Sequence, residues 1–89
     1  MEIKKTFVLK NKLGVHARVA AKIVGVTGRY RSVVTLEHDG IAADGKSILS
    51  ILTLACPLGG RLAVTADGED AQIVIEEIAR LISDKFGEE

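Results

Sequence analysis

The chain has 89 residues, the size of one small domain, and its 47% hydrophobic and 27% charged residues are typical of a folded globular protein. Its 12 Lys and Arg residues balance 12 Asp and Glu residues, and this zero net charge argues against sequence-independent nucleic-acid binding. It has no Trp and only three other aromatic residues, which argues against a base-stacking platform. We therefore treat residues 1–89 as a single domain with no nucleic-acid partner.

Nothing in the sequence directs the chain to a membrane or to an oxidising compartment. The first residues, Met-Glu-Ile-Lys-Lys, are not followed by the long apolar run of a signal peptide, and no stretch approaches the ~20 apolar residues of a membrane span. Cys56 is the only cysteine, so no intrachain disulfide forms. We expect a cytoplasmic protein without membrane insertion.

The first elements follow from a change in hydrophobic period. Alternating apolar residues over 3–9 predict a strand with one buried face, which ends at the turn over 11–14. Helical spacing over 17–27 predicts a helix that stops at Gly28. Gly25 weakens this helix by about 1 kcal/mol relative to alanine, and we interpret it as a point of close approach to the sheet.

The middle of the chain predicts a hairpin followed by a short helix. β-Branched and apolar residues over 33–36 indicate a second strand, and Asp39-Gly40 is a strong turn signal before a third strand over 41–43. Ser47 stands where an N-cap belongs, just before the very apolar segment 48–54.

The last elements are a strand and a long helix. Alternation over 62–66 predicts the strand, and the apolar stripe over 70–86 predicts the helix. We expect the final residues, 87–89, to be frayed. The order of elements predicts an α+β domain with helices on one face of an antiparallel sheet.

The most informative segment is Gly14-Val15-His16-Ala17-Arg18, where a loop becomes a helix. The first amides of a helix have no intrahelical acceptor and the helix dipole there is positive, so anions are favoured at this end. Histidine has a reference pKa of about 6.5, and a neutral ring nitrogen can attack phosphorus. Arg18 and the first amides, such as that of Ala17, would stabilise the phosphoryl charge without a metal. Gly14 allows close backbone approach or a conformation that other residues avoid.

The residues alone also allow a simpler interpretation of His16, since a histidine at a helix start is usually a cap or a surface side chain. No second histidine or carboxylate lies at metal-ligand spacing, so we predict no metal site. His38 stands alone in a turn signal, and we expect it to be solvated. There is no Walker-type loop and no serine–histidine–acid pattern.

Two motifs at a defined separation identify a family. Gly14–Arg18 resembles the active-site motif of HPr, the histidine-containing phosphocarrier of the bacterial phosphoenolpyruvate:sugar phosphotransferase system, and Asp44–Ile48 resembles its second signature. Ser47 lies 31 positions after His16, as in the family. The resemblance covers essentially the whole chain. It implies an open-faced β-sandwich, a four-stranded antiparallel sheet covered on one face by three helices, two long and one short.

The resemblance also implies a function and partners. Phospho-enzyme I would phosphorylate His16 on Nδ1, and His16 would pass the group to an enzyme IIA, with Arg18 stabilising it. The protein would be a carrier and not an autonomous enzyme, it would need no cofactor, and we expect a monomer. Ser47 would be the site of an HPr kinase/phosphorylase.

The apolar residues after Ser47 fit a docking role. Ile48, Leu49 and Leu52 are candidates for an exposed patch where a partner docks transiently, and a phosphate on Ser47 would weaken docking to an acidic partner. The simpler interpretation is that Ser47 is only a helix cap and that these residues pack in the core, as we expect for Ile51 and Leu54.

Three positions depart from the family pattern. Val19 replaces a proline, which leaves an extra N–H and loosens the first helical turn, so we expect altered rate or lifetime of the phosphorylated form. Ala55 stands where the family often has glycine. Cys56 lies in a Cys-Pro-Leu-Gly-Gly linker unlike the family's, and we interpret it as a small buried apolar residue.

Alternative functions remain open at this stage. Residues 11–14 resemble the nitrogen-regulatory branch of the family, whereas 44–48 resemble the sugar branch with kinase control. The protein could also serve mainly as a regulator phosphorylated on Ser47. A small ligand-binding domain of the ferredoxin-like kind would share the order of elements but leaves both motifs unexplained.

Overall fold

The computed structural model describes residues 1–88. It contains β1 (Glu2–Val8), α1 (Ala17–Thr27), β2 (Val33–His38), β3 (Ile41–Asp44), α2 (Ile48–Leu52), β4 (Arg61–Asp67), α3 (Ala71–Ser83) and a closing 3-10 turn, η1 (Lys85–Gly87). Each strand and helix that the sequence predicts is present in the predicted order.

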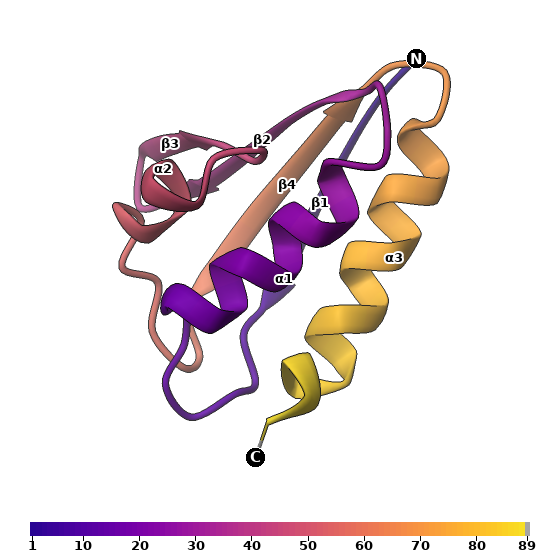
Figure 1. The fold of residues 1–89 in the computed structure, drawn as a ribbon. Helices are drawn as coiled ribbons and strands as arrows, with labels where there is room; N and C mark the ends of the chain where they lie inside the picture. Colours follow the sequence, from indigo (N-terminus) through magenta and orange to yellow (C-terminus); the bar gives the residue numbers. More distant parts are fainter. Residues whose placement is uncertain (89) are drawn as a thin grey trace.

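The strands form one antiparallel sheet in the order β1-β4-β2-β3. β4 lies between β1 and β2, with Phe7 opposite Leu62 and Leu36 opposite Val64. Figure 1 shows α1 and α3 running side by side across one face of the sheet, with α2 beside β3. The predicted α+β fold with helices on one face of a four-stranded sheet is confirmed.

The core lies between this face of the sheet and the helices. Leu62, Val64 and Ala66 of β4 are fully buried, as their alternation predicts, and α1 contributes Val19 and Ile23. Phe86, three residues beyond the end of α3, is also buried, so the closing turn contributes to the core. No helix within residues 1–88 covers the opposite face of the sheet (Figure 1).

Local turn and cap chemistry explains the region from β2 to α2. Asp39 and Gly40 both have positive φ, 50° and 80°, which is the backbone of a tight two-residue hairpin turn. The Ser47 hydroxyl accepts a hydrogen bond from the Ser50 amide at 3.2 Å, so Ser47 is the N-cap that the sequence predicts.

The structure corrects two expectations about the helices. Gly25 is exposed and a Cβ added there would meet nothing within 4 Å, so it marks no close approach to the sheet. α3 ends at Ser83 rather than near Phe86, because Lys85 and Phe86 take φ of 53° and 54° and the helix cannot continue through left-handed backbone.

Asp70, at the start of α3, joins that helix to the end of the loop before β2. Its carboxylate makes no cap bond to its own helix. It accepts hydrogen bonds from the Ser32 hydroxyl, from the Arg31 amide at 2.9 Å and from the Ser32 amide at 3.0 Å. These bonds, led by that from the Ser32 side chain, lower the pKa of Asp70.

The loop before α1 is attached to the loop before β4 through its backbone. The Val15 amide donates to the Cys56 carbonyl at 2.8 Å. Gly14 has φ of 63°, a left-handed conformation that favours glycine. A Cβ there would also lie 2.2 Å from the Cys56 carbonyl oxygen, so the close backbone approach requires glycine as well. The buried Asn11 side chain donates to the Gly14 carbonyl at 2.8 Å and closes the turn.

Within residues 1–88, no helix has the length and apolar character needed to cross a membrane. The same residues include no group of three or more His, Cys, Asp or Glu side chains placed to hold a metal ion.

Two glycine substitutions should have opposite effects on stability. Gly14→Ala should lower the free energy of unfolding by more than about 2 kcal/mol, because it adds left-handed strain and a clash with the Cys56 carbonyl. Gly25→Ala should raise it by about 0.5–1 kcal/mol, because alanine fits the open helix surface with less loss of backbone entropy. Denaturant unfolding measures both. Equal effects of the two substitutions would contradict the different environments that the structure assigns to them.

Candidate functional site

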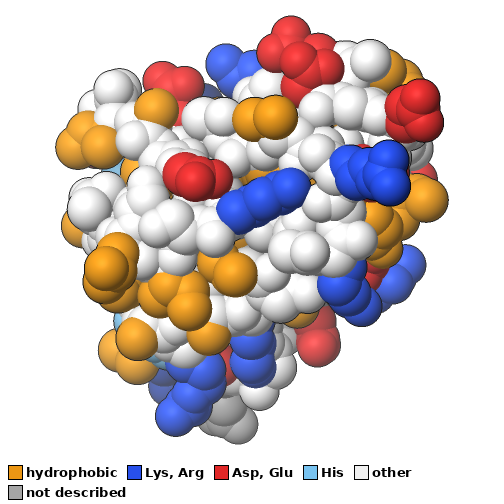
Figure 2. Space-filling view, turned by 45° about the horizontal axis from the view of Figure 1, so that its top comes forward, with side chains coloured by type: hydrophobic (Ala, Val, Ile, Leu, Met, Phe, Trp, Pro, Cys, Tyr) orange, Lys and Arg blue, Asp and Glu red, His pale blue; other side chains and the backbone are white. Residues whose placement is uncertain are grey.

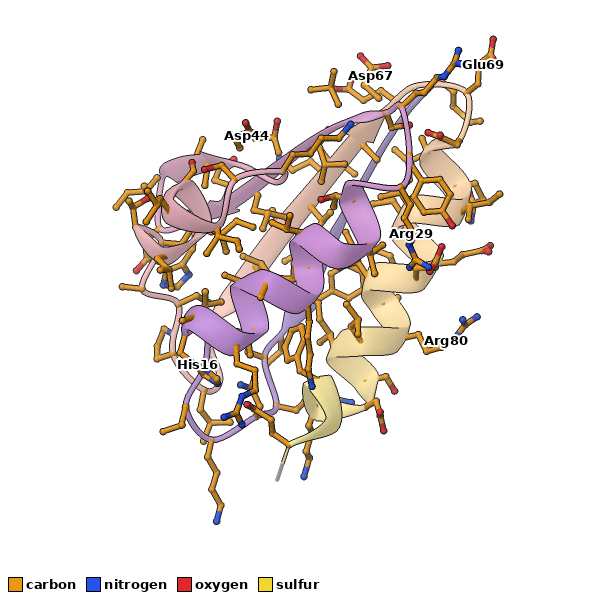
Figure 3. The ribbon with its side chains drawn as sticks, viewed as in Figure 1. His16, Arg29, Asp44, Asp67, Glu69 and Arg80 are labelled. Carbon is orange, nitrogen blue, oxygen red and sulfur yellow. The ribbon has the colours of Figure 1, made fainter. Side chains whose placement is uncertain are left out.

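His16 is the N-cap of α1 and sits at the junction that the sequence predicts. Its backbone is extended, with φ of −134° and ψ of −178°, and its carbonyl accepts the first helical hydrogen bond, from the Ala20 amide at 2.9 Å. Figure 3 shows His16 at the end of α1 that lies far from Asp67 and Glu69. The Val15–Cys56 hydrogen bond holds the residue before it, so the position of His16 depends on the loop contact described above.

The two ring nitrogens of His16 have different partners. Nδ1 lies 3.3 Å from the Arg18 amide nitrogen, and an amide N–H can only donate, so Nδ1 is the acceptor. Nε2 lies 3.0 and 3.1 Å from the two carboxylate oxygens of Glu88, which can only accept when ionised. These contacts match the tautomer with the proton on Nε2, which leaves the Nδ1 lone pair at the N-terminal end of α1, where the helix dipole is positive.

Glu88 is a member of the site that the sequence did not indicate. Besides His16, its carboxylate accepts a hydrogen bond from the Asn11 side chain at 3.3 Å. The His16 hydrogen bond is the main cause that lowers the pKa of Glu88, with contributions from Asn11 and from the charge of Arg18. The expectation that the last residues are frayed is wrong for Glu88, whose side chain is only 16% exposed. Residue 89 lies outside the described part of the chain.

The end of the chain reaches His16 because it reverses direction after α3. Lys85, Phe86 and Gly87 all have positive φ. Phe86 buries its ring in the core, and Lys22 of α1 donates to the Phe86 carbonyl. These contacts bring Glu88 next to a residue 72 positions earlier. Sequence spacing gives no signal for such a pair.

Arg18 extends its side chain toward solvent beside His16. Its side chain is 74% exposed, and its nearest guanidinium nitrogen lies 3.9 Å from the Glu88 carboxylate, too far for a short hydrogen bond. Lys12, Leu13, Arg18 and Glu88 line a shallow hollow beside His16. Leu13 is an exposed apolar side chain in the turn before α1.

The predicted docking residues differ in exposure. Leu49 is 78% exposed and Ile48 39%, whereas Leu52 is partly buried and packs against the core. Ile51 and Leu54 are in the core as predicted. Figure 2 shows hydrophobic side chains gathered on the side of the molecule that carries α2, with Lys and Arg side chains next to them.

Two other predicted side chains are now placed. His38 is not solvated as expected, since its side chain is 12% exposed and its Nδ1 lies 2.9 Å from the Arg61 carbonyl oxygen. Cys56 is buried as predicted, and burial raises the pKa of its thiol. The part of Cys56 that contacts the site is its backbone carbonyl, which accepts the hydrogen bond from the Val15 amide.

Comparison with known proteins agrees with the geometry. The family model described as PTS HPr component phosphorylation site matches residues 3–84. The chain belongs to the HPr family. It is similar to phosphocarrier protein HPr of Cupriavidus necator, at 37% identity over 78 residues covering 88% of each chain. It is also similar to phosphocarrier protein NPr of Proteus mirabilis, at 34% identity over 82 residues covering 91% of each chain.

Solved HPr structures share the fold. HPr-C-His from Thermoanaerobacter tengcongensis superposes with a TM-score of 0.92 at 36% identity over 98% of each chain. An HPr dimer from the same organism has a TM-score of 0.77 at 35% identity, covering 92% of this chain and 94% of that one. The family expected from the sequence is confirmed, and it replaces the alternative of a ferredoxin-like ligand-binding domain.

The structure shows the local environment of two residues, Ala55 and Val19, that depart from the HPr pattern. Ala55 has φ of 49°, the left-handed backbone that glycine adopts without strain, which explains the family's preference for glycine there. Val19 is fully buried in the first turn of α1, so its side chain packs in the core, and its amide is one of the first amides of the helix.

Proposed function

We propose that residues 1–89 form a single HPr-type phosphocarrier domain that acts in the cytoplasm. His16 accepts a phosphoryl group on Nδ1 from phosphorylated enzyme I and passes it to enzyme IIA proteins, without a cofactor. The observation that carries this proposal is the hydrogen bond from the Arg18 amide to Nδ1, which places a ring lone pair at the start of a helix.

The chemistry needs only a nucleophile and donors for the phosphoryl oxygens. The Nδ1 lone pair attacks phosphorus on the donor's phosphohistidine, and the donor's N–P bond breaks with its electron pair returning to the donor nitrogen. The phosphoryl group then occupies the Nδ1 position that the Arg18 amide now faces. That amide, the Ala17 amide and the exposed Arg18 guanidinium can donate to its oxygens.

The protein is a carrier and not an autonomous catalyst. The hollow beside His16 is shallow and open, and it is lined by few side chains, Lys12 and Leu13 among them. A phosphoryl donor and an acceptor must therefore each bring their own active site to His16. Partner docking, rather than enclosure of a small substrate, determines whether transfer occurs.

His16→Ala should abolish phosphorylation. With enzyme I and phosphoenolpyruvate, the wild-type chain should gain the mass of one phosphoryl group, and the modification should be acid-labile. His38→Gln is the matched control and should be phosphorylated like the wild type, because His38 lies in the β2–β3 hairpin and hydrogen-bonds Arg61. Mass spectrometry before and after acid treatment measures this. An acid-stable phosphate, or none on the wild type, would overturn the proposal.

We place the partner surface on the residues after Ser47. Leu49→Ala should weaken docking by about 1 kcal/mol, which raises the concentration of carrier needed to half-saturate enzyme I roughly fivefold. Ile73→Ala is the control, because Ile73 is a 50% exposed apolar residue of α3. Steady-state transfer at varied carrier concentration tests the two variants, and equal behaviour would place docking elsewhere.

We also assign regulatory phosphorylation by an HPr kinase/phosphorylase to Ser47. Incubation with ATP and that kinase should give an acid-stable phosphate that is absent from Ser47→Ala and present in Ser50→Ala. Loss of the cap bond to Ser50 should also lower the free energy of unfolding of Ser47→Ala by about 1 kcal/mol. If Ser47→Ala is labelled as well as the wild type, Ser47 serves only as a cap.

The expected functional form is a monomer, because a carrier must present the same His16 to different partners in turn. The HPr dimer from Thermoanaerobacter tengcongensis describes the state of that protein and not of this chain. The mass of this chain in solution by light scattering decides its own state.

A further inference from the structure

The carboxylate of Glu88 engages one ring nitrogen of His16 and leaves the other free. Both carboxylate oxygens lie within hydrogen-bond distance of Nε2, at 3.0 and 3.1 Å. Nδ1 faces the Arg18 amide instead. A histidine whose second nitrogen donates to a carboxylate has its tautomer and ring orientation set by that carboxylate, as in catalytic and metal-binding histidines.

The structure holds this carboxylate in place from two directions. On one side the Asn11 side chain, which is fully buried, donates to Glu88 at 3.3 Å and to the Gly14 carbonyl at 2.8 Å. On the other side the buried Phe86, two residues earlier, fixes the end of the chain in the core. The Glu88 side chain is 16% exposed, far less than the 74% of Arg18 beside it.

We propose that Glu88 is a positioning residue for phosphoryl transfer, keeping the proton of His16 on Nε2 and offsetting the positive charge that the ring gains when Nδ1 bonds to phosphorus. This inference rests on the proposed function of His16. In the step, the Nδ1 lone pair forms the new N–P bond and the donor's N–P bond breaks toward the donor. No proton leaves His16, so the ring becomes an imidazolium whose Nε2–H faces the carboxylate.

The contact also has a consequence for Arg18. Oε2 of Glu88 lies closer to the ring nitrogen than to the guanidinium, 3.0 Å against 3.9 Å. Glu88 therefore interacts mainly with the His16 ring, and the Arg18 guanidinium can turn toward the phosphoryl oxygens. Loss of the Glu88 carboxylate should therefore lower the rate of phosphoryl transfer to Nδ1, without weakening the interaction of Arg18 with the phosphoryl oxygens.

A surface role for Glu88 in partner docking makes a different prediction from a role on the ring. Docking changes the concentration of carrier at half-saturation, whereas positioning changes the transfer rate at saturation. The experiment compares Glu88→Ala, Glu88→Gln and Glu88→Asp with Glu69→Ala, which removes an exposed charge at the far end of the molecule (Figure 3). The readouts are rapid-quench transfer from phosphorylated enzyme I and the NMR signal of the His16 Nε2–H proton.

Glu88→Ala should slow saturated transfer roughly tenfold or more, with half-saturation changed less than twofold, and its Nε2–H signal should disappear through exchange with water. Glu88→Gln, which keeps an acceptor without the charge, should retain the signal but transfer slowly. Glu88→Asp should recover part of the rate, and Glu69→Ala should match the wild type.

Unchanged saturated transfer in Glu88→Ala, or an effect confined to half-saturation, would overturn the positioning role. These outcomes are distinct from failure of the proposed function, because they require a wild-type chain that is phosphorylated on His16. A wild-type chain without that phosphate would overturn the proposed function first.

Discussion

The site depends on the contact between the loop before α1 and the loop before β4. Gly14 lies so close to the Cys56 carbonyl that no side chain fits, and the Val15 amide bonds to that same carbonyl. Because this contact sets where the chain enters α1, it also sets the position of His16 at the N-cap. A helix start is an anion-favouring end wherever it occurs, but only a fixed entry point lets one ring nitrogen lie against its first amides.

Around this fixed point, the site is assembled from two neighbouring segments and a third that is distant in the sequence. The loop at 11–15 supplies the turn, the first turn of α1 supplies Arg18, and the end of the chain supplies Glu88. The left-handed turn after α3 and the burial of Phe86 bring this last segment back. The strain of non-glycine residues in that turn is offset by core packing, which is a common arrangement at functional sites.

The same fold separates the reactive group from the surface around it. α2 is short and presents Leu49 to solvent while Ile51 on its other side fills the core. Its N-cap, Ser47, stands at the edge of this exposed apolar surface. A carrier needs such a division, since docking must be transient and general while the chemistry at His16 must be specific.

Much of this protein was predictable from the sequence, because its signals are local. Alternation and helical spacing set the order of elements, Asp39-Gly40 set the hairpin, and the two motifs set the family and pointed to His16 and Ser47. Each of these signals acts within a few residues of chain. The apolar stripe predicts a helix to Phe86, but α3 ends at Ser83, because Phe86 is buried by a left-handed turn and not by the helix. Gly25 lies on the open side of α1, and spacing alone does not say which side of a helix is open. Only the tertiary structure joined Glu88 to His16 and to Asn11, since contacts across 72 and 77 positions arise from how the core closes and leave no periodic trace in the sequence.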